Sequence, residues 1–292
     1  MNSNLYELEE IIMLKKFCLL AFAVIIAFGG LTMTDSNAEY VCGDANSDAA
    51  LNVSDAVFII NYVFIGGPAP DPGCCDNDCP PTVMDIDGNT YFAVKIGDQC
   101  WTAQNLKVTH YQNGDSIPNV TDAVTWEGLS TGAYCDYDND EDLVAVHGRL
   151  YNWYAVDDSR GIAPVGWHVP SDAEWKELEI YLGMTQAEAD AEGLRGTDEG
   201  GKLKESGPIY WLAPNLGATN ESGFTALPSG TRNYDGPFNN FGANATFWTS
   251  TEFVGYSAWQ RTILYDNSQI LRAGSGAPAK RYGFSIRCVK DQ

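Results

Sequence analysis

The pattern of apolar and polar residues divides the chain into four stretches. Residues 17–28 are an unbroken apolar run, and residues 56–65, AVFIINYVFI, are apolar except for Asn61. A segment rich in Gly, Pro and Cys follows over residues 66–82. From residue 83 onward, short alternating stretches are separated by Gly, Asn and Asp. We therefore expect a targeting segment, a small module, a linker over 66–82, and a large domain over 83–291.

The large domain begins and ends with strand patterns. Residues 90–96 alternate in polarity, and Asp87-Gly88 and Gly97-Asp98 are two-residue turn signals on either side. The last segment, YGFSIRCVKD, alternates as a closing strand. Between Gly193 and this segment the composition predicts loops and short strands.

One helix is clearly signalled, by PSDAEWKELEIYLG. Ser171 is its N-cap, Glu174 completes a capping box, and Gly183 ends it. The expected buried stripe is Trp175, Leu178, Ile180, Tyr181 and Leu182. A second short helix, capped by Thr185, is predicted over residues 186–192. One or two helices among short antiparallel strands indicate an α+β domain.

The first apolar run is typical of a secretory signal. Lys15 and Lys16 precede it, and Ser36-Asn37-Ala38 supplies small residues for cleavage. We predict a signal peptide over residues 1–38, with the true start at Met13, because the first twelve residues are acidic. No later run is long enough to span a bilayer. The mature protein is therefore expected outside the bacterial cell or on its surface.

The charge restricts the partners. The chain has 39 Asp and Glu against 17 Lys and Arg, a formal net charge of −22. Such a surface repels phosphate backbones, which disfavours nucleic acid as a partner. It suits calcium and neutral ligands.

The small module, residues 42–65, begins with a calcium-loop pattern. The expected ligands are Asp44, Asn46, Asp48, the carbonyl of Ala50, and Asp55. Alternate oxygen donors in a tight loop provide the hard ligands that calcium requires. The alternative is an Asx-rich turn that caps the following helix at Ser54. Ala49 stands where Gly would ease the turn.

GDANSDAALNVSDAVFIINYVF resembles one repeat of a type I dockerin, an EF-hand-like loop and helix. The resemblance implies Asp44, Asn46, Asp48 and Asp55 as calcium ligands. Dockerins carry two repeats and dock into cohesin domains, whereas this chain has one repeat, which disfavours cohesin as a partner. A helix apolar on nearly all sides must be buried. The large domain or another copy of the chain would have to cover it.

Secretion permits disulfides, and seven cysteines follow the predicted signal peptide. The odd number leaves one thiol free or shared between chains. Cys288 on the closing strand has Cys135 and Cys100 as candidate partners, and we favour Cys135. Cys42 would pair with Cys74 or Cys75. Spacing alone does not fix the connectivity.

Catalytic motifs are absent from the sequence. It contains no nucleophile elbow, P-loop or dinucleotide fingerprint. Its three histidines lie apart, and His168 is interpreted as structural. Asp172 and Glu174 are explained by helix capping, and Glu221 and Glu252 are the remaining candidates for a glycosidase pair. The alternation of Asp136, Asp138, Asp140 and Asp142 suggests a second calcium loop, but a solvated acidic loop fits better.

A Gly-rich stretch combines aromatic rings with amides and carboxylates, the groups that hold sugars. The candidate ligand-binding residues are Arg232, Asn233, Tyr234, Asp235, Asn239, Asn240 and Phe241. Tyr234 and Phe241 are expected to be exposed, whereas Trp248 is expected in the core. Trp211, Trp259 and Tyr265 are candidates to flank the site.

Seven blocks in order, among them IGDQCWTAQNLKVTHY, GRLYNWYAV, GWHVPSDAEWKELEIYLG and FWTSTE, resemble the Fibrobacter succinogenes major paralogous domain. The resemblance covers residues 83–291 and implies a loop-rich fold similar to the C-type lectins, in a secreted setting beside carbohydrate-handling modules. The sugar-binding triplets of C-type lectins are missing. We expect a non-enzymatic protein that binds glycan or a cell-surface partner. The alternatives are an extracellular carbohydrate-active enzyme and a structural assembly protein.

Overall fold

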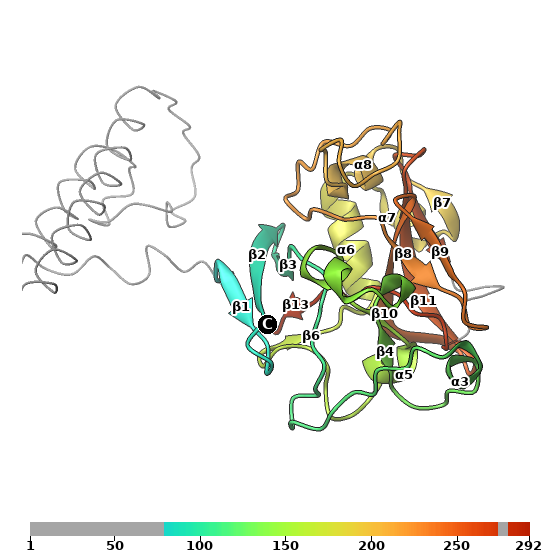
Figure 1. The fold of residues 1–292 in the computed structure, drawn as a ribbon. Helices are drawn as coiled ribbons and strands as arrows, with labels where there is room; N and C mark the ends of the chain where they lie inside the picture. Colours follow the sequence, from blue (N-terminus) through green and yellow to red (C-terminus); the bar gives the residue numbers. More distant parts are fainter. Residues whose placement is uncertain (1–78, 274–279) are drawn as a thin grey trace, which may run out of the picture. The chain divides into compact units, whose positions relative to one another are not determined.

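The computed structural model describes residues 79–273 and 280–292. Helices and antiparallel sheets are mixed in this part (Figure 1), which confirms the α+β class. The predicted signal peptide, the calcium loop with its ligands Asp44, Asn46, Asp48, Ala50 and Asp55, and cysteines 42, 74 and 75 lie outside the described residues. Within the described ranges, no helix has the length and apolar character needed to cross a membrane.

The first sheet joins the two ends of the domain. Its strands are β1 (Thr82–Met84), β2 (Thr90–Ile96), β3 (Gln99–Thr102), β6 (Trp167–His168) and β13 (Val289–Lys290). Their order is β1-β2-β3-β13-β6, so the last strand lies beside the early hairpin. The bounds predicted for β2 are confirmed, and Gly97 makes the β2–β3 turn with a φ of 62°.

The closing segment forms much less regular strand than its alternation predicts. Only β13 pairs continuously with β3 and β6. The residues before it make isolated bridges to three separate segments, for example from Phe284 to Tyr151 and from Gly283 to Arg232. The segment therefore threads through the core and ties several loops to the first sheet.

The second sheet contains the longest strands. It consists of β10 (Asn244–Val254), β11 (Ser257–Leu264), β12 (Ile270–Ala273) and β7 (Gly193–Arg195), in that order. The expectation of only short strands in this half is wrong. The hairpin of β10 and β11 is buried on both faces along much of its length, so its pattern is close to continuous rather than alternating.

Two small two-stranded sheets complete the strand structure. One pairs β4 (Tyr134–Cys135) with β5 (Leu150–Tyr151), and the other pairs β8 (Ser229–Arg232) with β9 (Phe238–Phe241). The short helical elements around them are α3 (Ala123–Glu127), η2 (Tyr137–Asn139), η3 (Glu141–Leu143), α4 (Val144–His147), α5 (Trp153–Val156) and α8 (Glu199–Leu203).

The two helices predicted from capping signals are present. α6 spans Asp172–Leu182, with the capping box of Ser171 and Glu174 formed and Gly183 at its end. α7 spans Gln186–Asp190 and has a second capping box, from Thr185 and Glu188. It ends two residues before its predicted end at residue 192.

The buried stripe of α6 differs from the prediction at two positions. Trp175, Leu178 and Leu182 are buried as expected, but Tyr181 is 65% exposed and Glu179 is fully buried. Spacings of three and four residues place Glu179 between these apolar side chains and turn Tyr181 outward. A charged residue therefore occupies a core position.

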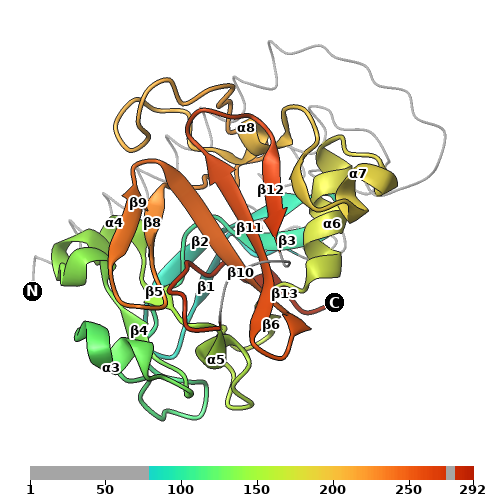
Figure 2. The ribbon, with the colours of Figure 1, turned by 90° about the vertical axis from the view of Figure 1, so that its right-hand side faces the viewer.

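The core is built on tryptophan. Between α6 and the second sheet, Trp101 and Trp175 pack edge to face with ring centroids 5.0 Å apart, and Phe224 and Phe247 extend the cluster. A second cluster surrounds Tyr151, Trp153 and Trp248. Figure 2 shows α6 beside the sheet that contains β11 and β12.

The Gly200-Gly201 pair in α8 is required by close backbone packing. A Cβ on Gly201 would lie 2.1 Å from the carbonyl oxygen of Gly217, and one on Gly200 would lie 2.4 Å from that of Gln269. No side chain fits at either position, because both obstacles are backbone atoms.

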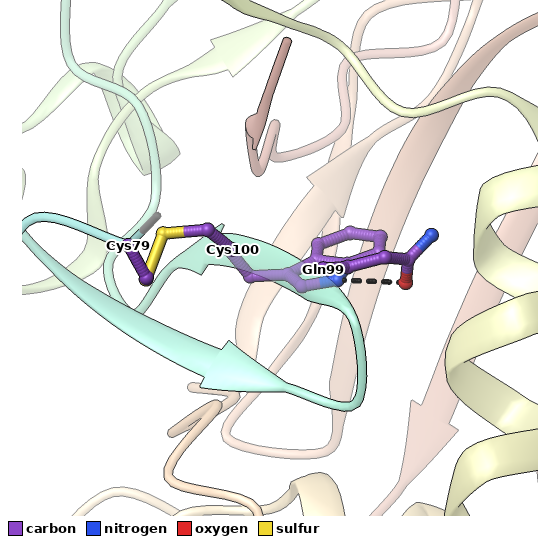
Figure 3. The surroundings of a disulfide bond; sticks show 4 residues. Cys79, Gln99 and Cys100 are labelled. Carbon is purple, nitrogen blue, oxygen red and sulfur yellow. Dashed lines mark hydrogen bonds between the residues drawn. A yellow bond between two sulfur atoms is a disulfide. The ribbon is translucent and has the colours of Figure 1, made fainter. Parts of the chain in front are cut away.

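A disulfide joins Cys79 to Cys100 on β3 (Figure 3). Beside it, Trp101 Nε1 donates to Gln99 Oε1 at 3.0 Å. The predicted bond between Cys135 and Cys288 is wrong, because both are free buried thiols. They lie in different core clusters, and Cys100, the other candidate partner, is already bonded.

Candidate functional site

The predicted ligand-binding residues lie on the β8–β9 hairpin and its turn. In this hairpin Ser229 pairs with Phe241 and Arg232 with Phe238. The Gly236 amide donates to the Asn233 carbonyl, which closes a tight turn with Tyr234 and Asp235 exposed at its tip. Phe241 lies at the opposite end, three strand steps from Phe238, or about 10 Å. The hairpin therefore separates the predicted set into two groups.

Arg232 belongs to neither group, because its side chain is buried. Its guanidinium donates to the carbonyls of Val120, Thr121 and Gly236, and it stacks 4.4 Å from the ring centroid of Trp126. Its donors are thus used to fix neighbouring loops. The prediction that Arg232 faces a ligand is wrong, since burial and backbone hydrogen bonds occupy the group.

At the tip, Tyr234 begins a series of aromatic contacts that leads inward. Tyr234 is 41% exposed, and its ring lies 5.4 Å from that of Tyr282. Tyr282 contacts Phe284, which packs against the buried Trp248 at 4.4 Å. Burial raises the pKa of Tyr282. The expected exposure of Tyr234 and burial of Trp248 are confirmed.

At the other end, Phe241 is the exposed member of an aromatic cluster that is otherwise half-buried or buried. It is 37% exposed, and its ring centroid lies 4.7 Å from that of Tyr137 and 4.7 Å from that of His147. Tyr137 also contacts Phe238, and His147 contacts Tyr210. We call Phe241, Tyr137, Tyr210 and the exposed Asn239 and Asn240 the Phe241 surface.

Local backbone geometry brings these rings together. Asn240 has a φ of 64°, so strand alternation ends there, and Phe238 and Phe241 both reach Tyr137. Gly230, opposite, has a φ of 67°, and a Cβ on it would lie 2.6 Å from the Tyr137 ring. The absence of a side chain at Gly230 thus makes room for Tyr137.

His147 supports the cluster from beneath. Its ring is buried, its Nδ1 lies 3.3 Å from Ser229 Oγ, and its own carbonyl accepts from Asn105 Nδ2 at 2.8 Å. Burial lowers the pKa of His147. The ring is therefore mainly neutral at neutral pH, and it contacts the Phe241 ring in a tilted arrangement, with an angle of 53° between the two planes.

Sequence reasoning missed Tyr137, His147 and Tyr210. Tyr137 lies in the acidic segment that was interpreted as a solvated loop, and it is separated from Phe241 by about a hundred residues. Within that segment Asp136 is buried against Arg149, whereas Asp138, Asp140 and Asp142 are exposed. No group of His, Cys, Asp or Glu suited to a metal ion occurs among the described residues.

The other residues considered from sequence have ordinary surroundings. Trp211 is buried against Ala226, to whose carbonyl its indole donates at 3.1 Å. Glu252 forms an ion pair with Lys280 at 2.8 Å, and Glu221 is exposed. Asp172 does more than cap its helix, because it forms ion pairs with Arg261 and Arg272 in the interior.

One family model matches most of the described domain. The model of the Fibrobacter succinogenes major domain matches residues 94–290. The chain belongs to this family. The match spans β3 to β13, including the Phe241 surface. No curated protein and no solved structure matches the chain.

Proposed function

We propose that this member of the Fibrobacter succinogenes major domain family is a secreted, non-enzymatic protein that binds glycan through the Phe241 surface. The observation that carries the proposal is the exposed ring of Phe241, which contacts the rings of Tyr137 and His147. Sugar rings present flat C–H faces, and a fixed aromatic ring offers a large apolar surface to pack against them.

Rigidity favours binding at this surface. Phe241 has two ring neighbours with centroids 4.7 Å away, so little side-chain freedom is lost when a ligand packs against it. Each rotamer-rich side chain that must be ordered on binding costs about 0.5–1.5 kcal/mol. A site ordered in advance avoids most of that cost.

The polar groups around the rings suit hydroxyls. Asn239 and Asn240 are exposed on β9, and Asp138 and Asp140 are exposed beside Tyr137. Amides donate and accept, while carboxylates accept from hydroxyl groups. With a net charge of −22, the chain repels anionic polymers, so the glycan we propose is neutral.

The finer fold assignment is part of the proposal. A C-type lectin-like fold is supported by the last strand beside the early hairpin, by α6 and α7, and by the loop-rich half between them. For residues 42–65 we propose a single dockerin-like repeat that binds calcium and stiffens the front of the chain. That proposal rests on the spacing of Asp44, Asn46, Asp48, Ala50 and Asp55.

A glycan array probed with the secreted chain, with calcium and with chelator, tests the function. Phe241→Ala should weaken binding roughly tenfold, or about 1.4 kcal/mol. Phe92→Ala is the matched control, because Phe92 is 65% exposed on β2, outside the Phe241 surface. Tyr234→Ala tests the other end of the hairpin. Tryptophan fluorescence should show that each variant is folded.

The outcomes separate the claims. Loss of binding in Phe241→Ala but not in Phe92→Ala supports the site. Loss in Tyr234→Ala alone keeps the function and moves the site to the turn. Absence of binding by the unaltered chain on a broad neutral-glycan array refutes the function and favours protein adhesion or assembly. Calcium-dependent self-association would favour assembly through the apolar segment over residues 56–65.

A further inference from the structure

A pocket of about 380 Å³ lies beside the end of the first sheet, away from the Phe241 surface. Residues that line it include Gln112, Gly166, Trp167, His168, Ser250 and Asp291. Figure 2 shows β9 at one side of the domain and β6, β13 and the C-terminus at another, and Figure 1 separates them as well. The pocket is thus independent of the proposed glycan surface.

One wall of the pocket is fixed by ion pairs. His168 Nδ1 lies 2.6 Å from Asp291 Oδ1, and its Nε2 lies 2.7 Å from Glu174 Oε1. Glu174 is itself held by Ser171, whose amide and hydroxyl both donate to Oε2 at 2.7 Å. These contacts therefore hold the N-terminus of α6, strand β6 and Asp291 in a fixed arrangement along this wall.

The ion pairs also settle what His168 can do. The hydrogen bond to Glu174, opposed by burial and supported by Asp291, raises the pKa of His168 to about 9. At neutral pH the ring is an imidazolium with both N–H groups used. It cannot act there as a general base or metal ligand. Two carboxylates face its single positive charge, one of them the 55% exposed side chain of Asp291, so this group of three side chains has no excess positive charge.

The remaining polar groups of the lining include acceptors, a hydroxyl and a donor. Gln112 Nε2 donates to the carbonyl of Ala163 at 2.8 Å, which fixes the amide. Within the described residues, Gln112 Oε1, Ser250 Oγ and Asp291 Oδ2 have no hydrogen-bond partner. The indole N–H of Trp167 likewise has no hydrogen-bond partner there, so the lining offers one donor, two acceptors and one hydroxyl. No cation without a partner lies among the residues that line it.

These properties define the class of ligand. Acceptors, a hydroxyl and an indole donor suit a ligand whose groups both donate and accept hydrogen bonds, and the two carboxylates give no attraction to an anion. At about 30 Å³ per water, the pocket holds about a dozen waters, comparable to the dozen non-hydrogen atoms of a hexose. We propose that this pocket binds a single neutral sugar residue.

Titration of the isotope-labelled full chain with methyl β-D-glucopyranoside and methyl α-D-mannopyranoside, followed by NMR, tests the proposal. One of the two should give saturable shifts at the His168 ring, the Trp167 indole and the Gly166 amide. Ser250→Ala and Asp291→Asn should each weaken binding at least fivefold. Ser130→Ala, at an exposed serine, should leave it unchanged, as should Phe241→Ala.

The proposal is overturned if neither glycoside shifts these signals. It is also overturned if Ser250→Ala and Asp291→Asn both bind as the unaltered chain does, or if n-butylamine binds more tightly than either glycoside. Phe241→Ala leaves this pocket intact. The glycan-array test of the Phe241 surface and the NMR test of this pocket can therefore succeed or fail independently of each other.

Discussion

Replacing the buried Glu179 by Gln should destabilise the domain severely. Glu179 Oε1 accepts from Arg195 Nη2 at 2.9 Å and from Arg261 Nε at 2.6 Å, and all three side chains are buried. Arg261 also donates to Asp172 through Nη1. Asp172 in turn accepts hydrogen bonds from Arg272 on both carboxylate oxygens. This network joins α6 to β7, β11 and β12.

The charges in the network give the size of the effect. Three guanidiniums face two carboxylates in the interior, and Glu179→Gln leaves only Asp172 to balance them. Burial opposes ionisation of Asp172, but hydrogen bonds from Arg272 and the charge of Arg261 hold its pKa at about 2. Removing one member of a buried ion pair costs about 3–5 kcal/mol, because the partner charge stays buried without compensation.

The assay is urea unfolding of the full chain, followed by tryptophan fluorescence. All eight tryptophans lie at or after residue 101, so the signal reports the described domain. In thermal unfolding, each kcal/mol of lost stability lowers the midpoint by roughly 2–4 °C for a domain of this size. The thermal midpoint of Glu179→Gln should therefore be lower by roughly 6–20 °C. Asp198→Asn is the matched control, because it removes a carboxylate paired with Lys202 at the surface and should cost under about 1 kcal/mol.

A free energy of unfolding within about 1 kcal/mol of the unaltered chain in Glu179→Gln would refute this reasoning. It would mean that the guanidiniums find water or other acceptors once Glu179 is neutral. A large loss in Asp198→Asn as well would show that the effect is one of total charge rather than of the buried network.

Four further predictions concern separate parts of the domain. The His168 pKa of about 9 exceeds its ordinary 6.5, so its ion pairs should stabilise the fold fully below pH 6.5 and lose their effect as the pH rises through 9. The difference in urea midpoint between the unaltered chain and His168→Asn should follow that course, and a constant difference would contradict it. Replacing Cys79 and Cys100 together by Ser should lower the free energy of unfolding by about 3 kcal/mol, because the disulfide closes a loop with a sequence separation of 21. Burial raises the pKa of the Cys135 thiol to about 12, so mass spectrometry should find Cys135 alkylated only after unfolding. Gly201→Ala should cost about 1–3 kcal/mol in urea unfolding, since its Cβ would meet a backbone oxygen, and an unchanged midpoint would show that the Gly217 loop yields.

Local chemistry explains why parts of the fold could be predicted. The capping box of Ser171 and Glu174 and the turn at Gly97 each depend on residues within four positions of one another, and both are present. For β2, Thr90–Ile96, the alternation was sufficient to give the bounds but not the burial, because Tyr91 and Ile96 are both buried and lie on opposite faces of the strand. Seven ordered blocks of sequence were enough to indicate the family, which the match over residues 94–290 confirms.

The candidate site could be predicted only in part. Phe241 and Tyr234 were expected at the surface and lie there, because aromatic residues beside Gly and Asn fall in turns. Arg232 was misassigned, since its buried position depends on carbonyls more than a hundred residues earlier in the chain. Likewise the pairing of Cys100 with Cys79 depends on which strands become neighbours.

The sequence alone therefore determined the elements whose causes are local: caps, turns, an alternating strand and the α+β class. The tertiary structure alone decided which distant groups meet. It placed Tyr137 and His147 around Phe241, brought Asp291 to His168, and surrounded Glu179 with arginines from two strands. The physical reason is that a side chain's propensity acts over a few residues, whereas burial and charge pairing depend on the packing of the whole domain.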